Sequence, residues 1–254
     1  MLNPDHMPEA DSCPQPGHEP SPVPPPYPAP HSFPPETLLH LQKGFSRILW
    51  GMPLGVLLFA GVIQVRWPPF MRLPPYVMAV VLIGWGLAAL FAASLPRRAW
   101  RNALRLCAGL VFLLFYFAPF LQWWTAQPYS TYLTLNVLGL LTTAAIVLYA
   151  VNMLVSEAAA AFGLRTMQIE ARLCAFSSLA VVLLPLWGWI GYAGYHAWRY
   201  NWPLTGVLEG LYQLPLFHWA TLLPLIPLAF TLTMCGKMSL VAEKQLNNGK
   251  QSTS

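Results

Sequence analysis

Six apolar runs dominate this chain, and each is long enough to cross a lipid bilayer as a helix. About 20 residues, rising 1.5 Å each, cover the hydrocarbon core of a membrane. The runs occupy 44–65, 76–95, 103–124, 132–155, 173–195 and 214–235. The sequence therefore predicts an all-α integral membrane protein with a bundle of about six transmembrane helices.

The scarcity of charge supports this prediction and excludes other classes of protein. Only 9% of the 254 residues are charged, against roughly 25% in soluble domains. So few ions cannot cover the surface of a soluble protein of this size. The net charge is +5, but the positive charges are scattered between apolar runs, which argues against nucleic acid as a partner. The expected surroundings are a lipid bilayer.

The distribution of Lys and Arg predicts the orientation. Basic residues concentrate in cytoplasmic loops, and here they divide eleven to three between the two sides. The eleven lie on the side of the amino terminus: Lys43, Arg47, Arg97, Arg98, Arg101, Arg105, Arg165, Arg172, Lys237, Lys244 and Lys250. Both termini are therefore expected in the cytoplasm. Arg and Ala usage with few lysines favours a bacterial inner membrane.

The chain divides into three parts by composition. Residues 1–35 hold thirteen of the 26 prolines and no Lys or Arg, which predicts a disordered cytoplasmic tail. Within it, Pro24-Pro25-Pro26-Tyr27 matches the Pro-Pro-x-Tyr ligand of WW domains, although a plain tether explains the same composition. Residues 36–236 form the predicted transmembrane domain. Residues 237–254 are expected to be a short polar cytoplasmic tail.

Polar residues inside the apolar runs are few, and four of them share one face of the fourth run. Thr142, Tyr149, Asn152 and Ser156 follow one another at offsets of seven, three and four, which places them on one side of a helix. This face could line a polar path through the membrane. Hydrogen bonding between helices is the alternative.

Motifs for catalysis or metal binding are missing from the sequence. There is no His-Glu-x-x-His, no Gly-x-Ser-x-Gly and no phosphate-binding loop, so we predict no catalytic residue and no cofactor. His196 and His218 flank an aromatic-rich connection and could hold a haem or a metal. Histidines in an interfacial aromatic belt explain both residues more simply, and no metal site is expected.

One short motif lies between the fourth and fifth runs. Glu157, Ala158 and Ala159 are followed after three residues by Gly163, and the aliphatic Leu173 comes after nine more. In this register the segment resembles the cytoplasmic loop of the membrane (permease) subunits of bacterial ABC importers. That family's pattern ends in Leu-Pro, where this chain has Ala175 and Phe176. An Ala-rich extension of the fourth helix, broken at Gly163, is the alternative.

Two functional hypotheses follow. The resemblance implies a transport subunit whose loop 157–172 couples to a cytoplasmic ATPase, because a short helix beside the glycine turn would dock on that partner. The alternative is a non-catalytic membrane scaffold or assembly protein, which recruits soluble partners through its Pro-rich tail and packs its helices against another membrane protein.

Overall fold

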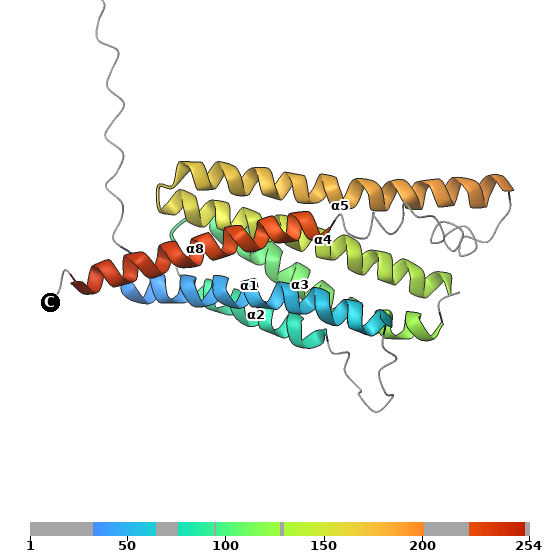
Figure 1. Ribbon diagram of the computed structural model, residues 1–254, viewed down its shortest axis with the longest axis horizontal. Coiled ribbons are helices and arrows are strands. Elements are labelled where there is room, and N and C mark those ends of the chain that lie inside the picture. Colours follow the sequence, from blue (N-terminus) through green and yellow to red (C-terminus); the bar gives the residue numbers. More distant parts are fainter. Residues whose placement is uncertain (1–32, 65–75, 94, 128–129, 201–223, 252–254) are drawn as a thin grey trace, which may run out of the picture. The chain divides into compact units, whose positions relative to one another are not determined.

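The computed structural model describes residues 33–64, 76–93, 95–127, 130–200 and 224–251. Every regular element among these residues is an α-helix, so the predicted all-α class is confirmed for them (Figure 1). The helices are α1 (Pro35–Gln64), α2 (Val77–Ala92), α3 (Arg98–Ala126), α4 (Thr131–Ala161), α5 (Arg165–Tyr200) and α8 (Leu225–Gln251).

Each predicted span overlaps one of these helices. Four of the described helices, α3, α4, α5 and α8, are long and apolar enough to cross a membrane by length and composition. The apolar helix α2 is shorter, with 16 residues, and α1 has 30 residues with Pro53 inside it. Several helices extend beyond the apolar runs. In particular, α8 continues through most of the segment that we expected to be a polar tail.

Two sets of helices pack side by side along their lengths. In one set α1 lies against both α2 and α8, and in the other α4 lies between α3 and α5; α8 also contacts α4 and α5. Large side chains from these helices, including Phe45, Trp100 and Leu154, are fully buried in the common core. All of the helices described thus contribute to one packed bundle.

Close approach of α1 and α2 depends on glycine. A Cβ atom at Gly86 would lie 2.9 Å from the carbonyl oxygen of Gly44 and 2.8 Å from Cγ1 of Ile48. A Cβ atom at Gly44 would lie 2.5 Å from Cδ2 of Leu90. Small residues at such crossings let two helix backbones come closer than larger residues permit. A side chain at Gly86 would therefore press on the α1 backbone, and one at Gly44 would displace the buried Leu90 side chain.

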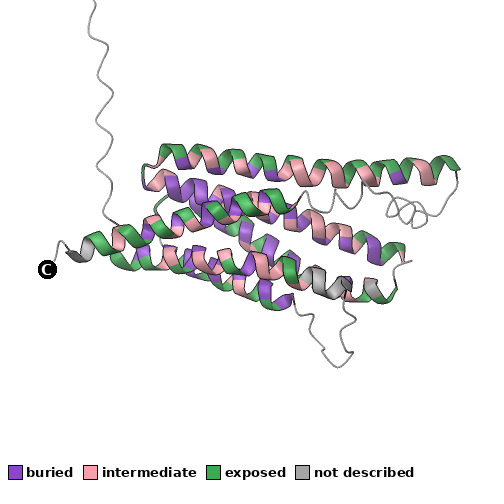
Figure 2. Cartoon of the chain, viewed as in Figure 1, coloured by how far each residue is buried: buried purple, intermediate pink, exposed green. Residues whose placement is uncertain are grey.

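Burial differs sharply between two neighbouring helices (Figure 2). In the most apolar 18-residue stretch of α4, which we call its span window, 50% of the residues are buried within the protein. In the span window of α5 the share is 11%. The buried residues of α5 are Met167, Ala171, Ala175 and Ser178 in its first half and Ala193 in its second. Helix α5 therefore packs on the bundle mainly through its first four turns.

Candidate functional site

The connection between α4 and α5 is a short turn around Gly163. This glycine has φ of 72°, in the left-handed region that glycine adopts without strain. The Leu164 N–H donates to the Ala159 carbonyl at 2.9 Å, and the Gly163 N–H donates to the Ala160 carbonyl at 3.3 Å. These are the two hydrogen bonds of a Schellman motif. The predicted loop 157–172 thus consists of the last turns of α4, this turn and the first turns of α5.

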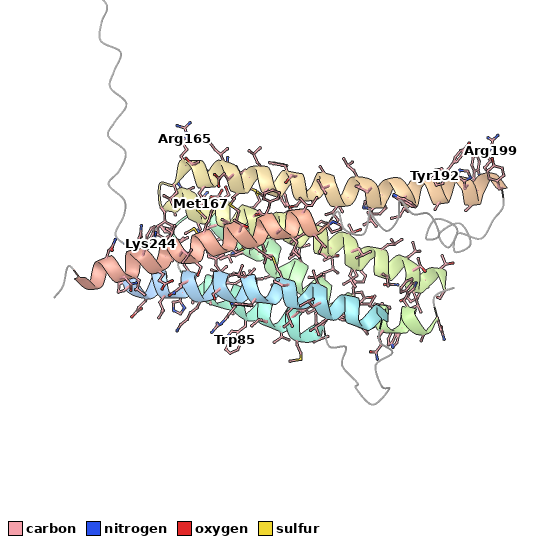
Figure 3. All side chains as sticks on the ribbon, in the orientation of Figure 1. Trp85, Arg165, Met167, Tyr192, Arg199 and Lys244 are labelled. Atoms are coloured by element: carbon pink, nitrogen blue, oxygen red, sulfur yellow. The ribbon has the colours of Figure 1, made fainter. Side chains whose placement is uncertain are left out.

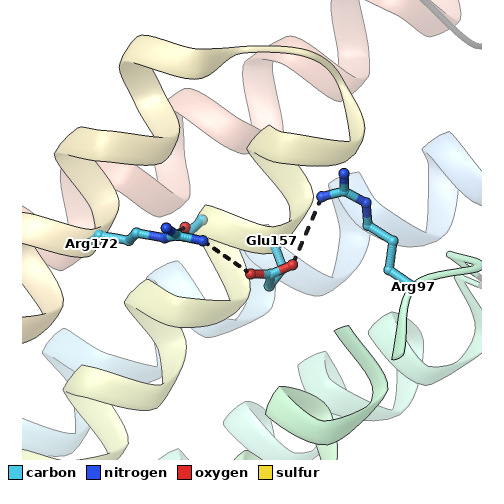
Figure 4. A network of polar contacts seen from close by, with 4 residues as sticks. Arg97, Glu157 and Arg172 are labelled. Atoms are coloured by element: carbon cyan, nitrogen blue, oxygen red, sulfur yellow. Dashed lines mark hydrogen bonds and ion pairs between the residues drawn. The ribbon is translucent and has the colours of Figure 1, made fainter. Parts of the chain in front are cut away.

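Glu157 lies about one turn from the end of α4 and is shared by two arginines (Figure 4). Its Oε1 lies 3.7 Å from Nη2 of Arg172 on α5, and its Oε2 lies 3.8 Å from Nη1 of Arg97, which precedes α3. Nε of Arg172 also donates a 3.2 Å hydrogen bond to Oγ of Ser156. We call these four residues the Glu157 cluster. It connects α4 to the segments packed on both sides of it.

Electrostatics explain why this carboxylate needs partners. The C-terminal end of a helix carries partial negative charge, which disfavours an acidic side chain there. The Glu157 side chain is only 11% exposed, so water stabilises its charge weakly. The two arginines are about half exposed and keep most of their own hydration. They can therefore stabilise the carboxylate at a small desolvation cost to themselves.

The residues that resemble the permease loop are mostly packed inside the bundle. Ala158 and Ala159 are fully buried and Glu157 is 8% exposed, while Gly163 is exposed. Small side chains here allow α4 to approach its neighbours closely. The geometry gives Glu157, Ala158 and Ala159 a packing role within the protein, and the coupling of this segment to an ATPase stays a prediction.

A second ion pair lies nearby on the outside of the bundle. Nζ of Lys237 on α8 lies 2.9 Å from Oε2 of Glu170 on α5, and both side chains are nearly half exposed. Sequence reasoning singled out Glu157 and segment 157–172 but did not find the partners of its acids. Arg97 and Lys237 lie 60 and 67 positions away from the acids they meet. The only available signal was that all of these residues were predicted on one side of the membrane.

The polar face of α4 faces neighbouring helices. Nδ2 of Asn152 donates to Oγ1 of Thr231 on α8 at 2.7 Å, and Thr231 in turn donates to the Pro227 carbonyl. The Tyr149 ring packs edge-on against Phe176 of α5, with centroids 5.8 Å apart. These contacts and the bond of Ser156 match the alternative of interhelical bonding.

Two acceptor or donor atoms of this face have no partner among the described residues. They are Oδ1 of Asn152 and Oγ1 of Thr142, and both atoms are buried. The two grooves described in the structure lie elsewhere, between α2 and α3 and at the α3–α4 connection. A polar path along Thr142, Tyr149, Asn152 and Ser156 stays a prediction.

The histidine pair is described only in part. His196 stacks on Tyr200 with ring centroids 5.3 Å apart and lies 4.3 Å from the centroid of Tyr192. His218 and the Pro-rich segment 1–32, with its Pro-Pro-x-Tyr match, lie outside the described residues. Among the residues that the structure describes, no group of three or more His, Cys, Asp or Glu could hold a metal ion. His196 thus contacts aromatic rings of its own helix, and its place in an interfacial aromatic belt stays a prediction.

Comparison of the chain with protein-family models, with characterised proteins and with solved structures finds no match.

Proposed function

We propose that this protein is a six-span membrane protein with both termini in the cytoplasm, and that it serves as a non-catalytic subunit of a larger membrane complex. The topology is supported by the chain itself, in which four described helices are long and apolar enough to span. The subunit role is supported by α5, because only 11% of the residues in its most apolar stretch are buried within the described part of the protein.

The ends of the helices agree with this orientation. Arg165 and Lys244 lie at the same end of the bundle, and Tyr192 and Arg199 lie at the other end of α5 (Figure 3). The Glu157 cluster and the Glu170–Lys237 pair gather further basic residues at the first end. Basic residues favour the cytoplasmic side, while Trp and Tyr favour the interface.

Cysteine labelling tests the orientation. In a variant that lacks the four natural cysteines, Arg165→Cys and Arg199→Cys are introduced separately. An impermeable maleimide added to intact cells should label Arg199→Cys, because that site is proposed to be outside. Arg165→Cys should react only after the membrane is opened. The reverse pattern would reject the orientation, and recovery of the protein in the soluble fraction would reject the membrane topology.

The second half of α5, residues 183–200, resembles a surface on which another helix docks. We call it the outer half. Gly188, Gly191 and Gly194 are exposed, and a Cβ atom at any of them would meet no described residue within 4 Å. Large apolar side chains of this half are also at least half exposed: Leu184, Trp187, Tyr192, Tyr195, Trp198 and Tyr200. Glycine weakens a helix by about 1 kcal/mol, and in membranes it concentrates where another helix packs. We propose that a transmembrane helix of another membrane protein covers this face.

Bulky substitutions at the glycines test the subunit role. At both positions a Cβ atom meets no described atom within 4 Å, so Gly188→Leu/Gly191→Leu should leave the fold intact while it blocks docking. In native membranes solubilised with a mild detergent, the wild type should migrate as a larger complex and the variant at monomer size. Gly236→Leu on α8, also without a neighbour within 4 Å, is the matched control. A wild-type monomer, or a complex that survives the double substitution, would reject the proposal.

Coupling to a transport ATPase is a second candidate function, because segment 157–172 exposes one large apolar side chain on which such a partner could dock. Ile169, in the second turn of α5, is 51% exposed and lies within segment 157–172. An ATPase that docks there would be lost from the purified complex in Ile169→Glu. The same loss in Gly163→Ala would support coupling through the turn, whereas retention of an ATPase in both variants would reject it.

A further inference from the structure

An apolar groove runs along the outside of the α2–α3 pair. Its walls extend from Val80 to Phe91 on α2 and from Ala108 to Phe115 on α3, and its volume is about 380 Å³. No charged residue occurs in either wall segment. In these walls Phe91 is 47% exposed and Phe112 is 74% exposed, so the groove opens to the surroundings of the bundle.

The length of the groove matches one leaflet of a bilayer. From Val80 to Phe91 the helix rises about 16 Å, which is about half of the ~30 Å hydrocarbon core. Phe91 lies at the end of α2 that leads into Arg97 and α3, the end proposed above to be cytoplasmic. The groove therefore has the extent and polarity expected for an acyl chain of the cytoplasmic leaflet.

Three arginines continue the groove face of α3 toward that end. Arg98, Arg101 and Arg105 are separated by three and four residues, and Arg101 precedes Ala108 by seven. These spacings place Arg101 on the side of the groove wall, with Arg105 and then Arg98 toward the edge of that side. All three are exposed, and the first turns of α3 thus carry three positive charges directly beside an apolar surface.

These charges differ from the neighbouring Arg97, which has a counter-ion among the described residues. Arg97 pairs with Glu157, and that carboxylate is also held by Arg172. In the part of the chain that the structure describes, no ion pair joins Arg98, Arg101 or Arg105 to an acid. The basic triplet therefore needs negative charge from outside the described residues.

We propose that the α2–α3 groove binds an anionic phospholipid of the cytoplasmic leaflet. One acyl chain lies in the groove, and Arg101 and Arg105 contact the phosphate, with Arg98 at the rim. The guanidinium group suits this role because its planar N–H groups bind phosphate oxygens in pairs. Its long aliphatic stem can cross the edge of the apolar region to reach a headgroup. The proposal rests on the membrane topology proposed above.

Lipid binding to the full-length protein, purified in detergent, tests this site. Native mass spectrometry compares phosphatidylglycerol with phosphatidylcholine of the same chains. The wild type should bind phosphatidylglycerol at least about tenfold more tightly, since each basic residue near anionic lipid contributes about 1 kcal/mol. Arg101→Gln/Arg105→Gln should remove most of this preference. Equal binding of the two lipids by the wild type would reject the proposal.

Matched variants separate the site from general effects of charge. Arg165→Gln/Lys244→Gln removes two positive charges from the same end of the bundle (Figure 3) and should leave the preference unchanged. An equal loss in this control would reject a specific site. Arg101→Lys/Arg105→Lys keeps the charge and should keep most of the binding. If the Gln variant loses its helical circular dichroism signal, the Lys variant becomes the test. A Lys variant with intact helices that shows no preference for phosphatidylglycerol would reject the proposal.

Two further measurements distinguish a bound phospholipid from a bound inorganic anion. Ala88→Phe, at an exposed alanine of the groove wall, should weaken phosphatidylglycerol binding by filling the groove. Inorganic phosphate should not displace the lipid at equal concentration, and full displacement would indicate a simple anion site and reject the proposal. If the protein is recovered from washed membranes but shows no preference for phosphatidylglycerol, only the lipid site is rejected. If the protein is recovered in the soluble fraction, the proposed topology is rejected as well.

Discussion

Helices α4 and α5 are equally apolar in their span windows, yet the protein uses them in opposite ways. Half of the α4 window is buried against other helices, and nine-tenths of the α5 window is not. Along α4 the inward face carries small and polar residues such as Ala159 and Asn152, which are fully buried. The outer half of α5 instead presents large aromatic side chains such as Trp198, which is 82% exposed.

The difference shows that apolar content does not decide which of these helices is central in the bundle. Lipid is as apolar as a side chain, so hydrophobicity alone does not draw two helices together in a membrane. Close packing and interhelical polar contacts draw them together, and α4 has both. If this interpretation is correct, substitutions on α4 should alter stability, while matched substitutions on the outer half of α5 should not.

The largest effect is expected when the arginines of the Glu157 cluster are removed. Arg97→Gln/Arg172→Gln leaves a nearly buried carboxylate without a cation, and we expect the free energy of unfolding to fall by about 2–3 kcal/mol. Denaturation of the purified protein, followed by tryptophan fluorescence, measures the change. Adding Glu157→Gln should restore most of the loss. Arg98→Gln/Arg101→Gln is the charge-matched control, and an equal loss there would contradict a specific role for the cluster.

The next effect concerns packing space. Ala159→Leu adds three carbon atoms at a fully buried position on α4, and overpacking of this kind should cost about 2 kcal/mol. Gly191→Leu on α5 adds a larger group at a position with no neighbour within 4 Å. In the isolated monomer it should leave the melting temperature unchanged or slightly raised, because Leu favours helix more than Gly does. Similar melting temperatures for the two variants would remove the contrast.

A smaller effect is expected from the bond between α4 and α8. In a double-mutant cycle of Asn152→Ala and Thr231→Val, the coupling free energy should be about 0.6 kcal/mol, the average for such bonds in membrane helices. Asn136 provides the control, because its side chain donates within its own helix to the Tyr132 carbonyl. Asn136→Ala should show no coupling to Thr231→Val. Zero coupling for the Asn152 pair would show that the bond does not hold α4 to α8.

The smallest effect is expected at the ion pair between α5 and α8. Glu170 and Lys237 are nearly half exposed, so their pairing should contribute less than about 0.5 kcal/mol. Lys237→Gln should lower the melting temperature slightly at low salt and not at all near 1 M salt, where exposed charges are screened. If Lys237→Gln lowered the stability as much as Arg97→Gln/Arg172→Gln does, and did so at every salt concentration, the predicted difference between the two sites would be wrong.

The sequence was a good guide to where helices form, because a run of about 20 apolar residues allows little else in a membrane. It was a poorer guide to where they end. Helix α3 begins at Arg98 and α8 continues to Gln251, since polar residues with good helix propensity extend a helix once packing has started it. The extension of α8 contains Lys237, and α5, which begins at Arg165 instead of 173, contains Arg172 in its own extension. Both side chains thereby reach acids on other helices.

The candidate site was predictable in part. The spacing of Asn152 and Ser156 predicts that they share one face, because the helical period alone decides it, and both residues are buried. The partners of that face could not be predicted, since Thr231 and Arg172 arrive from other helices whose order around α4 leaves no trace in the sequence. The burial of Ala158 and Ala159 was hidden for the same reason. Apolar residues facing lipid and those facing protein look alike in composition.

The tight turn at Gly163 also has a mechanical consequence. It fixes one end of α5 to the end of α4, and the pair formed by Glu157 and Arg172 fixes the same end again. From that pivot α5 extends for about 54 Å, at 1.5 Å for each of its 36 residues. A tilt of about 5° at the pivot displaces the far tip, at Tyr200, by about 5 Å over that length. Since the turn and the ion pair both hold the first end of α5, any tilt of the helix is largest at its second end, where few of its residues are buried.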